Sequence, residues 1–305
     1  MEFFNSFVTA VESGLMYAVL ALGFYISYSI LDFPDLSVEG TFLTGGVVFA
    51  VCVTHGVSPW IAMLFSAVSG ALAGAVTGIL HVKLKIRDLL CGILVSTALI
   101  TVNLITASVS NGGSFAGDGM TSVIISRRTP TVLRMFPFSE INDLEIRKLA
   151  AFFVIVIVIK LIIDLYLKTK SGMLLRATGD NSQFTAMLAR DSGNVKILGL
   201  SMGNALAALS GAICAQSKGS ADQSMGIGIV IIGLASVIIG MSVFKKVRFM
   251  KNTTKVILGA VIYQLCFAIA LILKVPSAYN KLIMAGLFAA ALIAGNKSPK
   301  GRVSK

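Results

Sequence analysis

Residues 150–163 read AAFFVIVIVIKLII, a run that is apolar on every face. A strand of a membrane barrel would alternate apolar and polar side chains over about ten residues, so this run predicts a helix instead. Apolar runs close to the ~20 residues that cross a bilayer as a helix recur along the chain. The expected fold class is therefore all-α, a polytopic transmembrane helical bundle.

The composition of the 305 residues agrees with a membrane protein. Apolar residues make up 56% of the chain and charged residues 13%, whereas about a quarter of the residues in an ordinary soluble domain are charged. The mean hydropathy is +0.87. These values argue against a water-soluble globule.

Apolar runs and charged breaks together predict about nine spans, in a range of roughly eight to ten. They lie at 7–30, 40–55, 59–82, 88–108, 149–167, 195–215, 224–244, 254–273 and 281–295. We expect them to form a single transmembrane domain over residues 1–305. The N-terminal residues lack the basic region of a signal peptide, so we expect the first span to be kept.

The net charge of +12 comes from short basic clusters between the spans. The clusters are Lys83/Lys85/Arg87, Lys168/Lys170/Arg176/Arg190/Lys196, Lys245/Lys246/Arg248/Lys251/Lys255 and Lys297/Lys300/Arg302/Lys305. An even number of spans separates each cluster from the next, so all four can face the cytosol, as the positive-inside rule requires. The connection 109–148 and the N-terminus then lie outside and the tail 296–305 lies in the cytosol. This explains the charge better than nucleic-acid binding does.

The connection 109–148 is the longest non-apolar stretch of the sequence. It opens with turn-forming residues, and 139–148 (SEINDLEIRK) is compatible with a short amphipathic helix that has Ser139 as its N-cap. An ordered outer connection is a candidate docking surface. The alternative is a solvated loop without a partner.

The segment 168–194 is the largest connection predicted on the cytosolic side. Phe184, Met187 and Leu188 recur at helical spacing after Asn181 or Ser182, which are suitable N-caps. Such a helix has an apolar stripe and no bilayer to bury it in. It either packs under the transmembrane bundle or docks on another protein.

The segment Leu31 to Gly40, LDFPDLSVEG, combines a proline with three carboxylates, those of Asp32, Asp35 and Glu39. This composition predicts irregular backbone that leads into a broken or re-entrant second span, because such backbone survives at membrane depth only when protein shields it. A short cytosolic loop is the alternative.

Small residues recur at four-residue spacing inside the spans, as in Gly70, Gly74 and Gly78. This spacing allows close helix packing, within one chain or between two copies. The glycines at 226, 228, 233 and 240 indicate that the span 224–244 is bent or broken.

Signatures of catalysis are missing from the sequence. There is no phosphate-binding loop, no H-E-x-x-H metal site and no G-x-S-x-G elbow. The cysteines Cys52, Cys91, Cys214 and Cys266 lie singly in apolar runs and predict inert buried thiols. We therefore expect no catalytic residues and no metal site.

Three stretches together resemble a known family. They are GLMYAVLALGFYISYSILDFPDLSVEG at 14–40, GMLLRATGDNSQFTAMLARDSGNVKILGLSMGNALAALSGAI at 172–213, and GLASVIIG at 233–240. They resemble the integral membrane permeases of ATP-binding cassette (ABC) importers in the branched-chain amino acid and ribose permease superfamily. DLSVEG is similar to the D-L-S-V-G signature of its sugar permeases. The subgroup that the chain resembles most pairs with binding proteins for tryptophan or related aromatic amino acids.

The resemblance implies a permease homodimer in a bacterial cell membrane, two cytosolic ATPase subunits, and an extracytoplasmic solute-binding protein. ATP and Mg²⁺ would bind to the ATPase, so no cofactor is expected in this chain. The family motif places the ATPase-coupling residues at Arg176, Ala177, Gly179, Asp180, Asn181, Phe184, Ala186, Met187, Leu188 and Arg190. Family members usually carry Gly-Ile or Gly-Val where this chain has Ala189 and Arg190.

The predicted function is therefore the translocation path of an importer for an amino acid, aromatic by subgroup resemblance. Candidate path residues are Glu12, Tyr17, Asp35, Glu39 and Asn103, chosen as polar or ionisable groups in or beside the spans. One alternative is a self-sufficient secondary transporter or channel for a small solute. Another is a membrane-embedded assembly subunit without a solute path.

Overall fold

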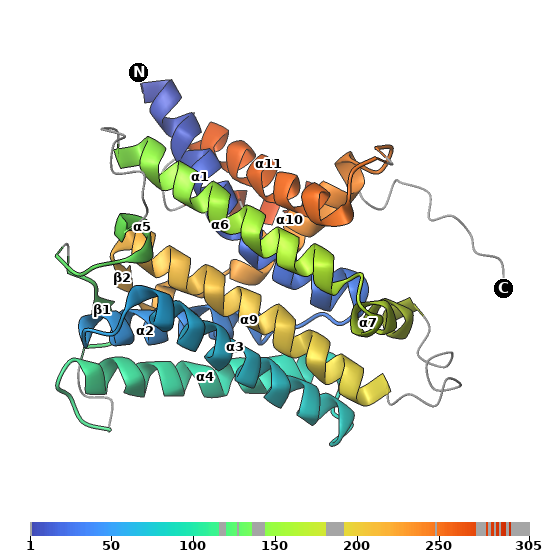
Figure 1. Ribbon diagram of the computed structural model, residues 1–305, viewed down its shortest axis with the longest axis horizontal. Coiled ribbons are helices and arrows are strands. Elements are labelled where there is room, and N and C mark those ends of the chain that lie inside the picture. Colours follow the sequence, from blue (N-terminus) through green and yellow to red (C-terminus); the bar gives the residue numbers. More distant parts are fainter. Residues whose placement is uncertain are drawn as a thin grey trace.

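The protein is a bundle of long helices in a computed structural model that describes residues 2–115, 120–126, 128–135, 144–180, 192–247, 249–272 and scattered positions from 279 to 293 (Figure 1). Its helices are α1 (Glu2–Phe24), η1 (Tyr25–Ile30), α2 (Val38–Thr54), α3 (Pro59–Val82), α4 (Asp88–Ser110), α5 (Val132–Met135), α6 (Leu144–Tyr166), α7 (Lys170–Asp180), α9 (Ser192–Lys218), η2 (Gln223–Met225), α10 (Ile229–Val243) and α11 (Asn252–Ile272). Two short strands, β1 (Val123–Ile124) and β2 (Ser220–Ala221), pair with each other.

Within the described residues, 7 helices are long and apolar enough to cross a membrane, and the shorter α2 is also apolar. Each of the first eight predicted spans falls on one of these helices. The ninth, 281–295, lies mostly outside the described residues. The predicted all-α transmembrane bundle is confirmed.

Helix α2 lies at the centre of the bundle, and most of its side chains are buried. It packs against α9, α3 and α4. A helix of 17 residues is only about 25 Å long, which is less than the ~30 Å hydrocarbon core. It starts late because residues 31–37 form no helix, as expected for a broken second span.

Helices α3 and α9 run antiparallel in close contact along a glycine seam. A side chain at Gly70 would strike Ala205 and Ala208, one at Gly74 the backbone of Leu200, and one at Gly78 the backbone of Ile197. These three glycines therefore let two helices of the same chain approach closely. They do not form a seam between two copies.

The predicted break in the span 224–244 is present at its start. The 3₁₀ helix η2 ends at Met225, and α10 begins only after Gly228, which adopts a left-handed conformation with φ of 83°. Glycine adopts this conformation without steric cost, and most other residues do not. The remaining α10 is a regular helix of 15 residues.

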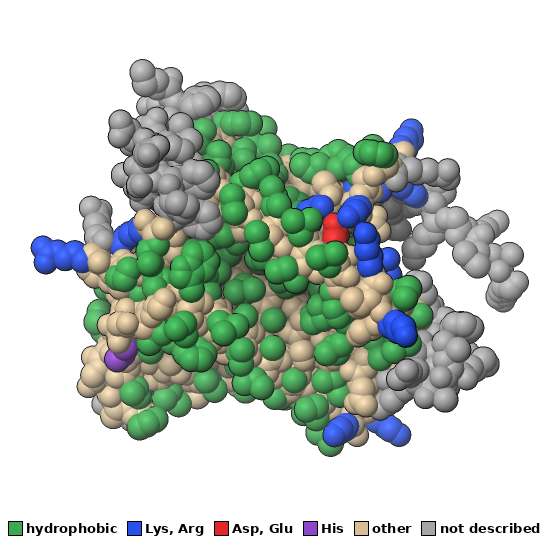
Figure 2. Space-filling model, viewed as in Figure 1, with side chains coloured by type: hydrophobic (Ala, Val, Ile, Leu, Met, Phe, Trp, Pro, Cys, Tyr) green, Lys and Arg blue, Asp and Glu red, His purple; other side chains and the backbone are tan. Residues whose placement is uncertain are grey.

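The strand pair β1–β2 and helix α7 lie at opposite ends of the bundle (Figure 1). At one end, the described parts of the 109–148 connection are ordered by the strand pair and by Gln216, whose amide oxygen accepts a hydrogen bond from the N–H of Val132. Helix α7 lies at the opposite end (Figure 1). Lys and Arg side chains gather around that end, with fewer at the other (Figure 2).

The predicted short helix over 139–148 is not a separate helix in its described part, 144–148. Helix α6 starts at Leu144 and continues without interruption to Tyr166, so 144–148 is the first part of a membrane helix. Ser139 lies outside the described residues.

We predict that Gly74→Val destabilises the protein by about 1–3 kcal/mol, because the new side chain would overlap the Leu200 carbonyl and push α3 away from α9. Thermal unfolding in detergent measures the effect. Val76→Leu, on the exposed side of the same helix, is the matched control and should change little. Equal stability of the two variants would contradict the close α3–α9 packing.

Candidate functional site

The end of the bundle that carries α7 is the candidate functional site. Helix α7 is amphipathic, with Leu175 and Thr178 buried while Met173 and Arg176 face outward. It follows α6 after a short turn and lies against η1 and α9. One face of α7 is thus fixed to the bundle, and the described residues leave the other face exposed.

Glycines set how closely α7 approaches the bundle. A side chain at Gly179 would overlap the carbonyl oxygen of Ile30, so only glycine fits at this contact. On α9, a side chain at Gly199 would strike both Leu31 and Leu175. Helix α7, the end of η1 and the start of α9 therefore form one tightly packed junction.

The irregular segment 31–37 is held in the protein interior by Asp35. Its Oδ1 accepts hydrogen bonds from the N–H of Ser37 at 2.8 Å and from the Ser37 hydroxyl at 2.6 Å. Its Oδ2 accepts one from the amide Nδ2 of Asn204, in α9, at 2.6 Å. Only 1% of Asp35 is exposed, so water does not solvate this side chain.

Burial raises the pKa of Asp35, and the hydrogen bonds from Ser37 and Asn204 oppose that rise. These donors stabilise the charged carboxylate in a place that water does not reach. Loss of one donor would leave a buried carboxyl oxygen without a partner, which costs more than loss of an ordinary solvent-exposed hydrogen bond. Asn204 is itself fully buried and also bonds to the carbonyl of Leu200 at 3.1 Å.

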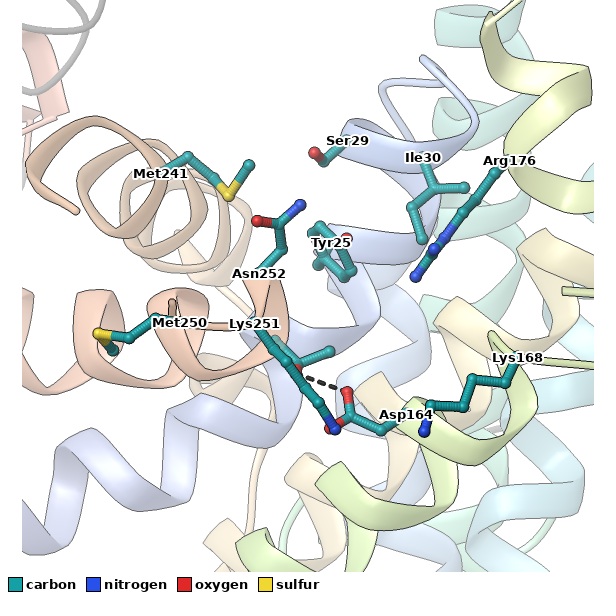
Figure 3. Close-up of a pocket in the computed structure, with 11 residues that line it drawn as sticks. Tyr25, Ser29, Ile30, Asp164, Lys168, Arg176, Met241, Met250, Lys251 and Asn252 are labelled. Carbon is teal, nitrogen blue, oxygen red and sulfur yellow. Dashed lines mark hydrogen bonds and ion pairs between the residues drawn. The ribbon is translucent and has the colours of Figure 1, made fainter. Parts of the chain in front are cut away.

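A second polar cluster surrounds Asp164, near the end of α6. Its Oδ2 lies 3.2 Å from Lys160 Nζ and 3.0 Å from Lys251 Nζ, and its Oδ1 accepts a hydrogen bond of 2.7 Å from the Thr253 hydroxyl. The cluster borders a cavity of about 580 Å³ between η1, α6, α7 and the start of α11 (Figure 3). Lys160 and Asp164 are one helical turn apart in α6, a spacing that allows such an ion pair.

Residues 6–292 match a family described as branched-chain amino acid transport system, permease component. The chain belongs to this family. A tyrosine transport system permease protein of Clostridioides difficile is 39% identical over 292 residues, which cover 96% of this chain and 92% of the relative. Permease components are membrane subunits of transport systems, so the predicted class, the permease subunit of an ABC importer, is confirmed. The family consists of transport components rather than enzymes.

Two further relatives are more distant from this permease. An uncharacterized protein of Rickettsia prowazekii is 33% identical over 215 residues, 70% of this chain and 69% of the relative. A probable branched-chain amino acid transport permease protein, LivH, of Methanocaldococcus jannaschii is 25% identical over 209 residues, 67% of this chain and 64% of the relative. No solved structure matches the permease.

The structure describes part of the predicted ATPase-coupling segment of the permease. Arg176, Ala177 and Gly179 lie in α7, and Asp180 is its last residue. The remaining predicted residues lie outside the described part of the chain: Asn181, Phe184, Ala186, Met187, Leu188 and Arg190. Their role stays a prediction.

Four of the five candidate path residues lie around the first half of α2, and Glu12 lies apart from them. The ring of Tyr17 stacks on Phe42 with centroids 6.4 Å apart. The Glu39 carboxylate accepts a hydrogen bond from the N–H of Gly228 at 2.8 Å. The Asn103 amide donates to the carbonyl of Gly40 at 3.3 Å.

Glu12 lies toward the end that carries the strand pair, where the hydroxyl of Ser217 donates to its carboxylate at 3.4 Å. Asp35 and Asn103 are buried, with 1% and 2% of their surface exposed, and their polar groups bond within the chain. Tyr17 and Glu39 are half-buried. A role in the path stays a prediction for all five.

Sequence reasoning missed the partners that connect distant segments. Nothing in the sequence assigns Asn204 to Asp35, which lies 169 positions away. Lys251 and Thr253 were likewise not linked to Asp164. Helix α7 was also not predicted at 170–180, because its two glycines and polar ends give a weak helical pattern.

We predict that Asn204→Ala lowers the stability of the permease by about 2 kcal/mol, because a buried carboxyl oxygen of Asp35 loses its hydrogen-bond donor. Thermal unfolding in detergent measures the change. The exchanged pair Asp35→Asn/Asn204→Asp keeps one carboxylate and one amide at the contact and should recover part of the loss. If the single variant were as stable as the wild type, the contact would not support the fold.

Proposed function

We propose that two copies of this permease enclose the translocation path of an ABC importer for an aromatic amino acid. A cytosolic ATPase binds the segment 173–190, and an extracytoplasmic binding protein delivers the solute at the end that carries the strand pair. The ATPase holds ATP and Mg²⁺, and the permease supplies the path and the moving parts.

One observation carries this proposal: the exposed face of α7 sits on a junction that leads directly to the helices around α2. Gly179 contacts Ile30, the segment 31–37 follows, and Asp35 bonds to Asn204 of α9. A displacement of α7 therefore moves 31–37 and α9 together. Because ATP binding changes the contacts that the ATPase makes with α7, it would favour one arrangement of these helices over another.

The solute class rests on the relative that is named as a tyrosine transport system permease protein and on the likeness to the aromatic amino acid subgroup. Identity of 39% over nearly the whole of both chains supports a shared solute class. The half-buried Tyr17 and Glu39 are the candidate path residues best placed to meet a solute, because Asp35 and Asn103 are occupied by buried hydrogen bonds.

We expect a tagged permease to capture the ATPase encoded nearest to its gene, and the variant Arg176→Glu/Leu188→Asp to lose at least about nine-tenths of this capture, because it reverses a charge on the exposed face of α7 and places a charge on the predicted apolar stripe. Co-purification from detergent extracts measures the capture. Lys170→Glu, an equal charge reversal at the first residue of α7, is the control and should retain it.

Reconstitution of the captured complex with its binding protein then tests the solute. Labelled tyrosine or tryptophan should accumulate in an ATP-dependent manner, and leucine should compete poorly. Capture of no ATPase by the wild type, together with uptake by the permease alone along an ion gradient, would instead establish a secondary transporter.

The orientation proposed for the permease places Ser114 outside the cell and Lys246 in the cytosol, because basic clusters are retained on the cytosolic side. In a background with the four cysteines replaced by alanine, Ser114→Cys should react with a membrane-impermeant maleimide in intact cells. Lys246→Cys should react only after lysis. The opposite pattern would overturn the orientation.

A further inference from the structure

The cavity beside Asp164 opens where several helical elements begin or end. Helices α6 and α10 and the π-helix η1 finish close to it, α11 starts there, and Arg176 of α7 lines it. The ends of membrane-spanning helices lie where the chain leaves the hydrocarbon core. The cavity therefore lies at the depth of the lipid headgroups. The basic clusters at this end place it on the cytosolic side under the orientation proposed above.

The lining of the cavity carries an excess of positive charge. Lys168, Arg176 and Lys251 line it together with a single carboxylate, that of Asp164 (Figure 3). Asp164 is already neutralised, because Lys160 and Lys251 both contact it. Among the described residues, neither Lys168 nor Arg176 forms an ion pair with a carboxylate. Within the part of the chain that the structure describes, these two cations beside the cavity therefore have no negative partner.

The rest of the lining is suited to the glycerol and upper acyl region of a lipid. Ile30, Met241 and Met250 contribute apolar surface, and methionine adapts its shape to irregular ligands. Ser29 and Asn252 add hydrogen-bonding groups between the apolar and basic parts. Apolar surface next to unpaired cations is the combination that an amphipathic anion requires.

Charged side chains at this end of the bundle reach its flank (Figure 2). Figure 2 views the molecule from a flank along the helices, and on this flank, near the end that carries α7, an acidic side chain lies among Lys and Arg side chains. Lipid reaches the flanks of a membrane protein, whereas a cytosolic subunit docks on its tip. A bound lipid would therefore reach Arg176 of α7 from the flank, whereas an ATPase would approach α7 from the tip.

We propose that this cavity binds the headgroup of an anionic phospholipid from the cytosolic leaflet. The phosphodiester lies among Lys168, Arg176 and Lys251, and the glycerol and first acyl carbons pack on Met241 and Met250. Basic pockets between transmembrane helices on this side of a membrane recognise such headgroups by charge attraction in an environment of low polarity.

The test is titration of dioleoyl phosphatidylglycerol into the detergent-purified full chain, followed by native mass spectrometry. We expect one site that Lys168→Glu weakens about thirtyfold, since the change removes two units of positive charge from the cavity. Lys83→Glu makes the same change at an exposed position that does not line the cavity, and it should alter binding less than about twofold. Lys168 has no carboxylate partner in the described chain, so its replacement leaves the Asp164 cluster intact.

Other ligands and a second variant separate the possible outcomes. Dioleoylglycerol, which lacks the phosphate, should not occupy the site, and inorganic phosphate should not displace the lipid. Displacement by inorganic phosphate would assign the cavity to a soluble phosphate compound and overturn the lipid proposal. Equal weakening by Lys168→Glu and Lys83→Glu, or none by Lys168→Glu and Lys251→Gln, would overturn a defined site. ATPase capture does not enter this test, so it stands or fails independently of the importer proposal.

Discussion

The hydrogen bond from Asn204 to the carboxylate of Asp35 is the contact on which the centre of this permease depends. Residues 31–37 form no regular structure, yet they lie inside the protein, where polar groups must find partners. Asp35 supplies those partners to Ser37 and ties the segment to α9. The contact thereby fixes where α2 begins, and α2 is the helix around which α3, α4 and α9 pack.

Helix α9, which holds Asp35 through Asn204, also packs closely against α2 and α3. Helix α9 meets α2 at Gly211, whose missing side chain leaves room for the carbonyl of Phe42, and it meets α3 along the seam at Gly70, Gly74 and Gly78. Interfaces packed this closely do not deform gradually, because any separation opens a void. A shift of α9 therefore displaces its neighbours as a unit, which is the behaviour that a coupled permease requires.

The sequence alone was sufficient for the spans and for several local features, because these depend on residues near each other in the chain. The bounds of α3, the break before α10 and the Lys160–Asp164 pair follow from apolar run length, glycine density and helical spacing. The π-helix η1 was not predicted, since YISYSI also suits a regular helix. The pairing of Asp35 with Asn204 was not predictable, because it depends on how distant helices pack.

The π-helix η1 lies between the two sites proposed at this end of the permease, the ATPase contact on α7 and the lipid cavity beside Asp164. Ile30 contacts Gly179 of α7 and also lines the cavity beside Asp164, together with Tyr25 and Ser29 of the same turn. π-Helices are rare, occur mostly as single turns within α-helices, and are frequent at functional sites. An occupant of the cavity would contact η1 directly, and an ATPase on α7 would act on it through the contact between Gly179 and Ile30. Both would therefore act on the same six-residue element. Because both act on one element, a ligand that prefers one position of η1 changes the free energy with which the other partner binds.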